Sequence, residues 1–188
     1  NVIMKLKLMK IHVNISFIPI MNPFGFSKGI RFNADLKSIN SGYFRTKSGK
    51  PEITEEGKIL NKNFIRISEL AKNGFLSCHE DVNEKHFFIY ELINDAKPDF
   101  FCQELQEIGN RYFGKKPDGK TYQGKTKDGV ILNEREGTID DYLFTIGNVH
   151  RSITIETPAT DDINKRVYVQ EQLITKFIEL YNVGRFFI

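Results

Sequence analysis

Three polar side chains of this 188-residue sequence are of types that carry out chemistry, and each lies in or beside an apolar run. His79 follows the run 75–78, Glu156 lies within the run 153–158, and Arg31 lies in a glycine-containing loop. A neutral histidine can bind a metal, a carboxylate can act as a general base, and a fixed arginine can stabilise a developing oxyanion. Ligands of α/β proteins bind beyond the carboxyl ends of strands. We therefore expect these three side chains to form a site where the carboxyl ends of the strands meet.

Each of these residues also has a purely structural explanation. A histidine at a strand end often makes only a hydrogen bond, and Arg31 could be a surface charge of its loop. Glu156 could face water from an edge strand, but a carboxylate in an apolar strand is costly unless it is paired or functional. We therefore favour a functional role for Glu156, and for His79 because of its place in the ordered set of motifs given below.

The pattern of apolar residues predicts alternating strands and helices, and therefore an α/β fold. Expected strands cover residues 13–20, 75–78, 87–90, 130–132 and 153–155. Expected helices cover a segment with Val2, Leu6 and Met9 on one face, residues 54–73, residues 98 to about 109, and a segment after an N-cap at Thr160. One face of this last helix carries Ile163, Val167, Ile174, Phe177 and Tyr181. Segments 22–29, 41–52 and 114–129 are expected to be loops because they contain glycine among polar residues.

Composition excludes several classes of protein. With 40% hydrophobic and 27% charged residues the chain is not disordered, and no run approaches the ~18 apolar residues of a membrane span. A net charge of +3 is too small to indicate a nucleic-acid partner. Cys78 and Cys102 cannot form a disulfide framework, so we expect a reducing compartment and a cytoplasmic location.

Two overlapping stretches, 114–121 and 119–126, match the phosphate-binding pattern G-x-x-x-x-G-K-[ST]. A working phosphate loop follows a buried strand and leads into a helix, whereas here a helix is expected before the loop and a strand after it. We therefore predict a solvated loop and no nucleotide site. Its basic residues are Lys115, Lys116, Lys120, Lys125 and Lys127.

Four short motifs follow one another along the chain: Asn22-Pro23-Phe24-Gly25-Phe26 leading to Arg31, Asn33 and Asn40; His79-Glu80-Asp81; the segment 137–143; and Thr154-Ile155-Glu156-Thr157-Pro158. In order and spacing they resemble the zinc carboxypeptidase family, which includes the succinylglutamate desuccinylase/aspartoacylase branch. The resemblance covers nearly the whole chain after about Val13.

The resemblance implies a mixed, mostly parallel sheet flanked by helices, of the phosphorylase/hydrolase-like type. It implies zinc as cofactor, with His79 as a ligand and Glu156 as the catalytic carboxylate. Arg31 would stabilise the oxyanion and, with Asn40, bind the substrate. The expected reaction is hydrolysis of an amide bond, most simply removal of the C-terminal residue of a peptide. Residues 1–188 would then form the latter part of a single catalytic domain.

The chain also departs from the family pattern. The family's first two zinc ligands come from an upstream His-x-x-Glu, which this sequence lacks. We expect them in a segment before Asn1, so that the fold is N-terminally incomplete. Ser38 and Ser41 replace an aspartate and the arginine that grips a terminal carboxylate in the family. The alternatives are an N-acyl amino acid deacylase and a non-catalytic binding module without zinc; membrane or nucleic-acid partners are not expected.

Overall fold

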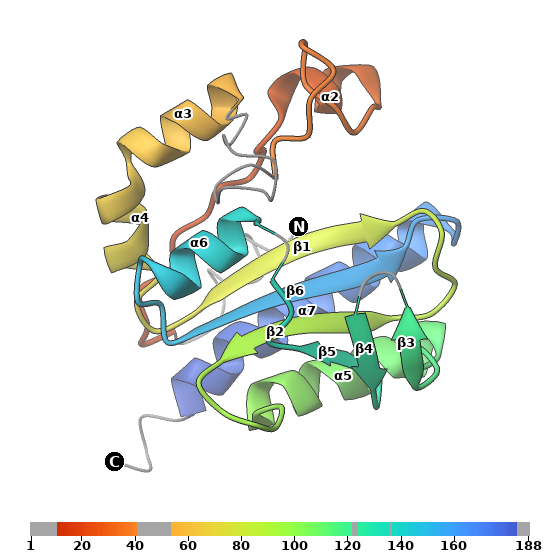
Figure 1. Cartoon of the computed structure of the whole chain (residues 1–188). Helices are drawn as coiled ribbons and strands as arrows, with labels where there is room; N and C mark the ends of the chain where they lie inside the picture. The colour runs from red at the N-terminus through yellow and green to blue at the C-terminus, as the bar shows by residue number, and fades with distance from the viewer. Residues whose placement is uncertain (1–10, 41–53, 122–123, 136, 184–188) are drawn as a thin grey trace. The chain divides into compact units, whose positions relative to one another are not determined.

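The structure is a computed structural model that describes residues 11–40, 54–121, 124–135 and 137–183 (Figure 1). The chain divides into two compact units. The first comprises the described parts of Asn1–Asn14, Leu76–Glu134 and Arg151–Ile188, and the second those of Ile15–Phe75 and Arg135–His150. The helix predicted near Val2 and the loop predicted at 41–52 lie outside the described residues. That the chain forms the latter part of one catalytic domain stays a prediction.

The first unit is built on a mixed six-stranded sheet with the order β1-β6-β2-β5-β4-β3. The strands are β1 (Phe75–Asp81), β2 (Phe88–Ile93), β3 (Gly119–Thr121), β4 (Gly124–Lys127), β5 (Val130–Leu132) and β6 (Arg151–Pro158). β2 pairs with β5 in parallel, while the pairs β2–β6, β4–β5 and β3–β4 are antiparallel.

β1 and β6 run in the same direction. The carbonyl oxygens of His79 and Asp81 accept hydrogen bonds from Thr157 Oγ1 and Ala159 N. A step of two residues along β1 thus matches a step of two residues in the same direction along β6, so the two strands are parallel. Parallel pairs are therefore two of the five between the described strands, and the carboxyl ends of β1 and β6 lie at the same edge. The predicted α/β fold with a mixed sheet flanked by helices is confirmed, but the described strands pair more often antiparallel than parallel, unlike the mostly parallel sheet that the resemblance implies.

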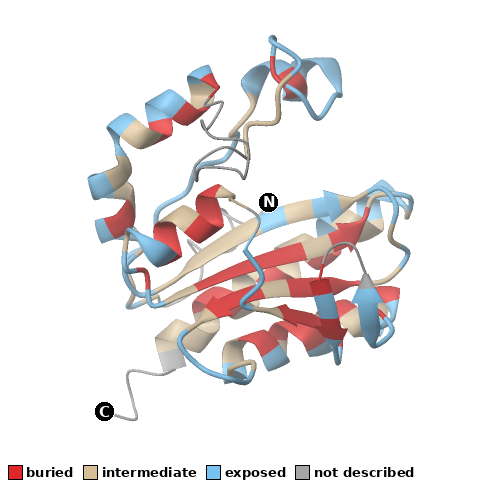
Figure 2. Cartoon of the chain, viewed as in Figure 1, coloured by how far each residue is buried: buried red, intermediate tan, exposed pale blue. Residues whose placement is uncertain are grey.

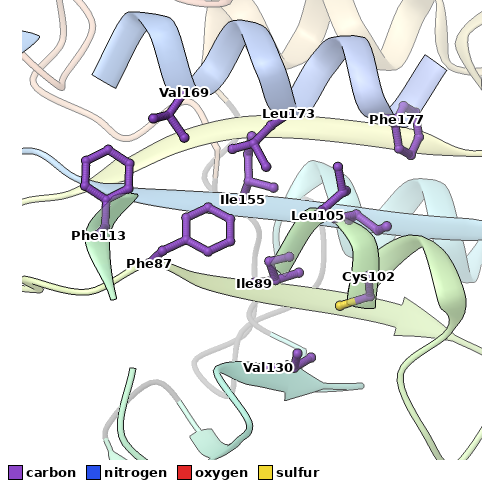
Figure 3. Close-up of a cluster of buried hydrophobic side chains, with 11 residues drawn as sticks. Phe87, Ile89, Cys102, Leu105, Phe113, Val130, Ile155, Val169, Leu173 and Phe177 are labelled. Atoms are coloured by element: carbon purple, nitrogen blue, oxygen red, sulfur yellow. The ribbon is translucent and has the colours of Figure 1, made fainter. Parts of the chain in front are cut away.

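Helices α5 (Phe100–Phe113) and α7 (Ile163–Val183) cover one face of this sheet (Figure 1). Their core contains Phe87, Ile89, Cys102, Leu105, Phe113, Val130, Ile153, Ile155, Val169, Leu173 and Phe177 (Figure 3). Buried residues are concentrated in β2 and β6 and on the helix faces that pack there (Figure 2). Since side chains alternate along a strand, the neighbours of Ile153 and Ile155 in β6 point to the opposite face.

The bounds of both helices differ from the prediction. α5 continues past Gly109 to Phe113. A glycine stands at position 109 because a Cβ there would lie 2.1 Å from the Phe87 ring. Gly109 is thus a point of close packing on the sheet and not a helix stop. α7 is capped by Asp162, whose Oδ1 accepts hydrogen bonds from the N–H groups of residues 164 and 165. The N-cap predicted at Thr160 is therefore wrong.

The predicted apolar face of α7 is only partly correct. Ile163 and Val167 are 54% and 53% exposed, whereas the buried positions are Val169, Leu173, Phe177 and Ile178. The helix packs along a stripe shifted from the one that the sequence pattern indicates. Among the described helices, none is both long and apolar enough to cross a membrane.

Segment 114–129 is not the loop that the sequence predicts. β3 and β4 form an antiparallel hairpin whose second strand pairs with β5. Both matches to the phosphate-binding pattern therefore run into strands and lack the helix N-terminus that such a loop needs. Lys116, predicted to be solvated, is 3% exposed.

The second unit is helical in its described part, with α2 (Pro23–Lys28), α3 (Glu55–Lys62), α4 (Phe64–Leu70) and α6 (Ile139–Thr145). Its core is formed by Leu60, Ile139, Leu143 and Val149 with partly buried neighbours. The single helix predicted over 54–73 is divided at Asn63, and segment 22–29 contains a helix where a loop was expected. The buried strand predicted at 13–20 is wrong: these residues form no strand, and Phe17, Ile18 and Ile20 are each more than 40% exposed.

Candidate functional site

His79 and Glu156 lie together in the first unit. His79 Nδ1 is 3.9 Å from Glu156 Oε1, and the two side chains are 30% and 13% exposed. This separation exceeds a hydrogen bond but places the carboxylate directly beside the imidazole. The structure thus places side by side the two residues that the sequence analysis assigned to metal binding and proton transfer.

The pleat of the sheet explains why both side chains are on the same side. Ile153 and Ile155 point into the helix-covered core, so Glu156 points to the opposite face. Glu156 stands across the antiparallel ladder from Phe88, the first residue of β2. A carboxylate with 13% exposure is held on a strand with neighbours on both sides, so it does not occupy the edge-strand position of the structural alternative.

β1 continues two residues past His79 and ends at Asp81 in a tight turn. Asp81 Oδ1 accepts hydrogen bonds from Asn83 N at 2.7 Å and Glu84 N at 3.1 Å. The Glu80 carboxylate pairs with Arg166 of α7. These contacts account for Glu80 and Asp81 as residues that shape the end of β1.

A buried ion pair lies beside the start of β2. Lys116 Nζ is 2.8 Å from Glu84 Oε2 and 3.9 Å from the centre of the Phe88 ring. Partial burial raises the pKa of the Glu84 carboxyl, but the hydrogen bonds from Lys116, Lys85 N and His86 outweigh it and lower the pKa to about 2. Glu84 is therefore ionised throughout the neutral range.

Sequence reasoning missed this pair. Lys116 stands in a run of lysines and glycines, and no local pattern distinguishes it from its solvated neighbours. Only the structure shows that Lys116 is buried, paired with Glu84 and packed on Phe88, the residue across the ladder from Glu156.

Arg31 belongs to the second unit, where it is exposed. Its main chain is held by the preceding motif: Asn22 Nδ2 donates to the Arg31 carbonyl at 3.0 Å, and Asn22 Oδ1 caps α2 by accepting from Gly25 N at 2.8 Å. A Cβ on Gly25 would lie 2.5 Å from the carbonyl oxygen of Ile30. The Asn-Pro-x-Gly motif thus has a structural explanation, which is to form the turn that presents Arg31.

The two asparagines of this segment differ. Asn33 is 2% exposed, and its side chain bonds to Asp35 N, Lys37 N and the Glu56 carboxylate, so it stabilises the loop. Asn40 is half-buried at the end of a described stretch. The structure therefore brings His79 and Glu156 together and places Arg31 and Asn40 in the other unit; the substrate-binding roles of the latter two stay predictions.

The described residues do not by themselves fit a catalytic zinc. Among the described parts of the chain, no group of three or more His, Cys, Asp or Glu side chains is arranged to hold a metal ion. A catalytic zinc normally takes three protein ligands and a water, and His79 alone cannot supply them.

Three solved structures that are similar to this chain are described as a "putative metallopeptidase". The protein of that description from Shewanella baltica OS155 is 29% identical, with a TM-score of 0.83 over 89% of this chain and 63% of its own. Those from Shewanella amazonensis SB2B and Shewanella denitrificans OS217 are 26% and 28% identical, with TM-scores of 0.80 and 0.78. They match over 87% and 85% of this chain and 62% and 58% of their own.

The chain therefore spans about three-fifths of the length of these structures. No protein-family model matches it, and no curated protein is significantly similar to it in sequence. The zinc carboxypeptidase family stays a prediction.

Proposed function

We propose that this chain carries part of the active site of a metal-dependent hydrolase that cleaves an amide bond. The observation that carries the proposal is the juxtaposition of His79 and Glu156, 3.9 Å apart on one face of the sheet. The similarity to three structures described as putative metallopeptidases supports it. His79 would be a metal ligand, and because the described residues do not complete a metal site, the other ligands must come from outside them.

In this proposal Glu156 is the general base. Its carboxylate would take a proton from the attacking water and later give it to the leaving amine. This role requires a carboxylate that is fixed in place and still reachable by water, and the Glu156 side chain is 13% exposed. Arg31 would stabilise the developing oxyanion, where loss of one such donor costs roughly 10² to 10³ in rate. Asn40 would bind the substrate with Arg31.

We assign zinc as the metal and a peptide as the substrate, with removal of its C-terminal residue. An N-acyl amino acid is the alternative substrate, because serine replaces the carboxylate-gripping arginine of the resemblance at Ser41. We also propose a reducing, cytoplasmic location, because two cysteines cannot form a disulfide framework.

The test uses the full-length protein and the variant Glu156→Gln, with Glu107→Gln on the exposed side of α5 as the control. The probes are N-benzoylglycyl-phenylalanine for C-terminal cleavage and N-acetyl-aspartate for deacylation. We expect Glu156→Gln to lose at least ~10² in kcat on the active probe because its amide cannot take a proton. Zinc content, measured by elemental analysis, should equal that of the wild type.

Activity of Glu156→Gln close to the wild-type rate would contradict the assignment of the base. Less than one zinc per full-length chain after reconstitution, with neither probe cleaved, would favour the non-catalytic binding module instead.

A further inference from the structure

The main chain at His79 is held from the helix-covered side of the sheet by two side chains. The His79 carbonyl oxygen accepts hydrogen bonds from Thr157 Oγ1 at 3.3 Å and from Gln170 Nε2 at 3.1 Å. Gln170 Nε2 is also 3.1 Å from Thr157 Oγ1. The three groups therefore form a closed triangle that joins β1, β6 and α7.

Thr157 connects this triangle to the candidate base. It is fully buried and directly follows Glu156 in β6, so its side chain points to the helices while Glu156 points to the opposite face. A hydrogen bond from Thr157 to the His79 main chain thus ties β6 to β1 at the point where His79 and Glu156 stand.

The position of Gln170 is fixed because its helix, α7, is packed into the core of the first unit. Its neighbour Val169 is fully buried, and Leu173, one turn further on, lies in the same core (Figure 3). Gln170 Oε1 is buried without a hydrogen-bond partner, which is costly for an amide. Leucine or methionine would fill this position at lower cost, so the benefit of glutamine here lies in its Nε2 donor.

We propose that Thr157 and Gln170 are positioning residues that hold His79 and Glu156 in their mutual arrangement. They touch the His79 main chain on the face opposite to the candidate site, so they act through His79 and not on a substrate. The catalytic consequence rests on the proposed function, but the positioning itself is a property of the protein without metal or substrate.

The test compares Thr157→Val, which keeps the side-chain shape without the hydroxyl, with Thr157→Ser, which keeps the hydroxyl. Gln170→Met removes the amide from the same position of α7. The matched controls are Thr160→Val, at an exposed residue between β6 and α7, and Gln172→Met, two residues after Gln170 in α7. All are made in the full-length protein.

The first readout needs no activity. In the metal-free protein, Thr157→Val and Gln170→Met should shift the NMR signals of the His79 ring and weaken its nuclear Overhauser contacts to Glu156. Amide exchange at the end of β1 should become roughly tenfold faster because local opening is easier. Thr157→Ser and both controls should behave like the wild type, which a general loss of packing would not reproduce.

The second readout is hydrolysis of N-benzoylglycyl-phenylalanine. Loss of a residue that orients a ligand from outside typically costs roughly 10- to 100-fold, so kcat should fall by this factor in Thr157→Val while KM changes less than threefold. Thr157→Ser should restore kcat to within about threefold.

Unchanged His79 signals and exchange in both Thr157→Val and Gln170→Met would overturn the proposal, and so would a Thr157→Ser variant as disturbed as Thr157→Val. If the wild type cleaves no probe and binds no zinc, the proposed function fails. The metal-free readout then still decides whether these residues position His79.

Discussion

Among single residues, Glu91 stands out because a carboxyl group is fully buried in the core of the first unit. Its Oε2 accepts a hydrogen bond from Asp99 N at 3.2 Å, and Asp99 in turn caps α5 and pairs with Arg151. Burial and, after it, the negative charge of Asp99 raise the pKa of Glu91 from its usual 4.5 to about 8. Burial also raises the pKa of the neighbouring Cys102 thiol, with the charges of Glu91 and Asp99 adding to it, so this thiol is protonated and inert.

This shift predicts a pH dependence of stability. Between pH 4.5 and about 8 the folded protein keeps the Glu91 proton that the unfolded chain has released. The free energy of unfolding should therefore fall as pH rises through this window, by up to about 1.4 kcal/mol per unit. The contribution is fully present below pH 4.5 and lost above about pH 8.

Glu91→Gln, which cannot ionise but can still accept from Asp99 N, should remove this slope. Urea unfolding at a series of pH values measures it, with the exposed Glu107→Gln as control. The assignment of the proton fails if the variant shows the wild-type slope between pH 5 and 8.

At the scale of elements, the contact of α5 with β2 decides how the core closes. Gly109 allows the helix to lie against the Phe87 ring, where a Cβ would approach to 2.1 Å. Phe87 is fully buried and sits in the same core as Leu105, so it has little room to move away. The close approach of α5 to Phe87 thus depends on glycine, which has no side chain, at position 109.

Gly109→Ala should therefore destabilise the protein by about 1–3 kcal/mol, as overpacking does, although alanine favours a helix by about 1 kcal/mol over glycine. Thermal unfolding of this variant beside Glu107→Ala, on the exposed side of the same helix, separates the two effects. A stabilised Gly109→Ala would show that α5 can shift outward at no cost.

For the whole molecule, the chain passes from one compact unit to the other more than once, since residues 15–75 and 135–150 form one unit and the segments between and after them the other. His79 and Glu156 come from separate segments of the same unit, whereas Arg31 belongs to the other unit. A metal that binds through His79 in the folded state alone would stabilise the unit that contains His79.

Zinc should accordingly raise the Tm of the full-length protein, and a chelator should lower it again. A free concentration of 100 times the Kd is worth about 2.7 kcal/mol of stability. His79→Ala should lose this response, while His150→Ala should keep it. Equal zinc-induced Tm shifts in wild type and His79→Ala, followed by differential scanning fluorimetry, would remove His79 from the set of ligands.

The sequence was most informative where the signal is local. The runs that became β1, β2, β5 and β6 were recognisable from their composition, and so was the apolar pattern of α5. Prediction failed where long-range packing decides: the local pattern indicates a helix stop at Gly109 and a loop over 114–129, whereas packing on Phe87 and pairing with β5 select other states. The pattern of segment 13–20 permits a buried strand, but these residues form none.

The sequence by itself determined that His79 and Glu156 belong to two different strand segments, because apolar runs and strand alternation are properties of neighbouring residues; β1 extends beyond the predicted end to Asp81. Only the tertiary structure decided that β6 lies beside β1, which brings these two side chains to 3.9 Å, and that Thr157 and Gln170 hold the His79 main chain. The physical reason is that strand order and helix packing depend on contacts between segments far apart in the chain, whose free energies no local pattern contains.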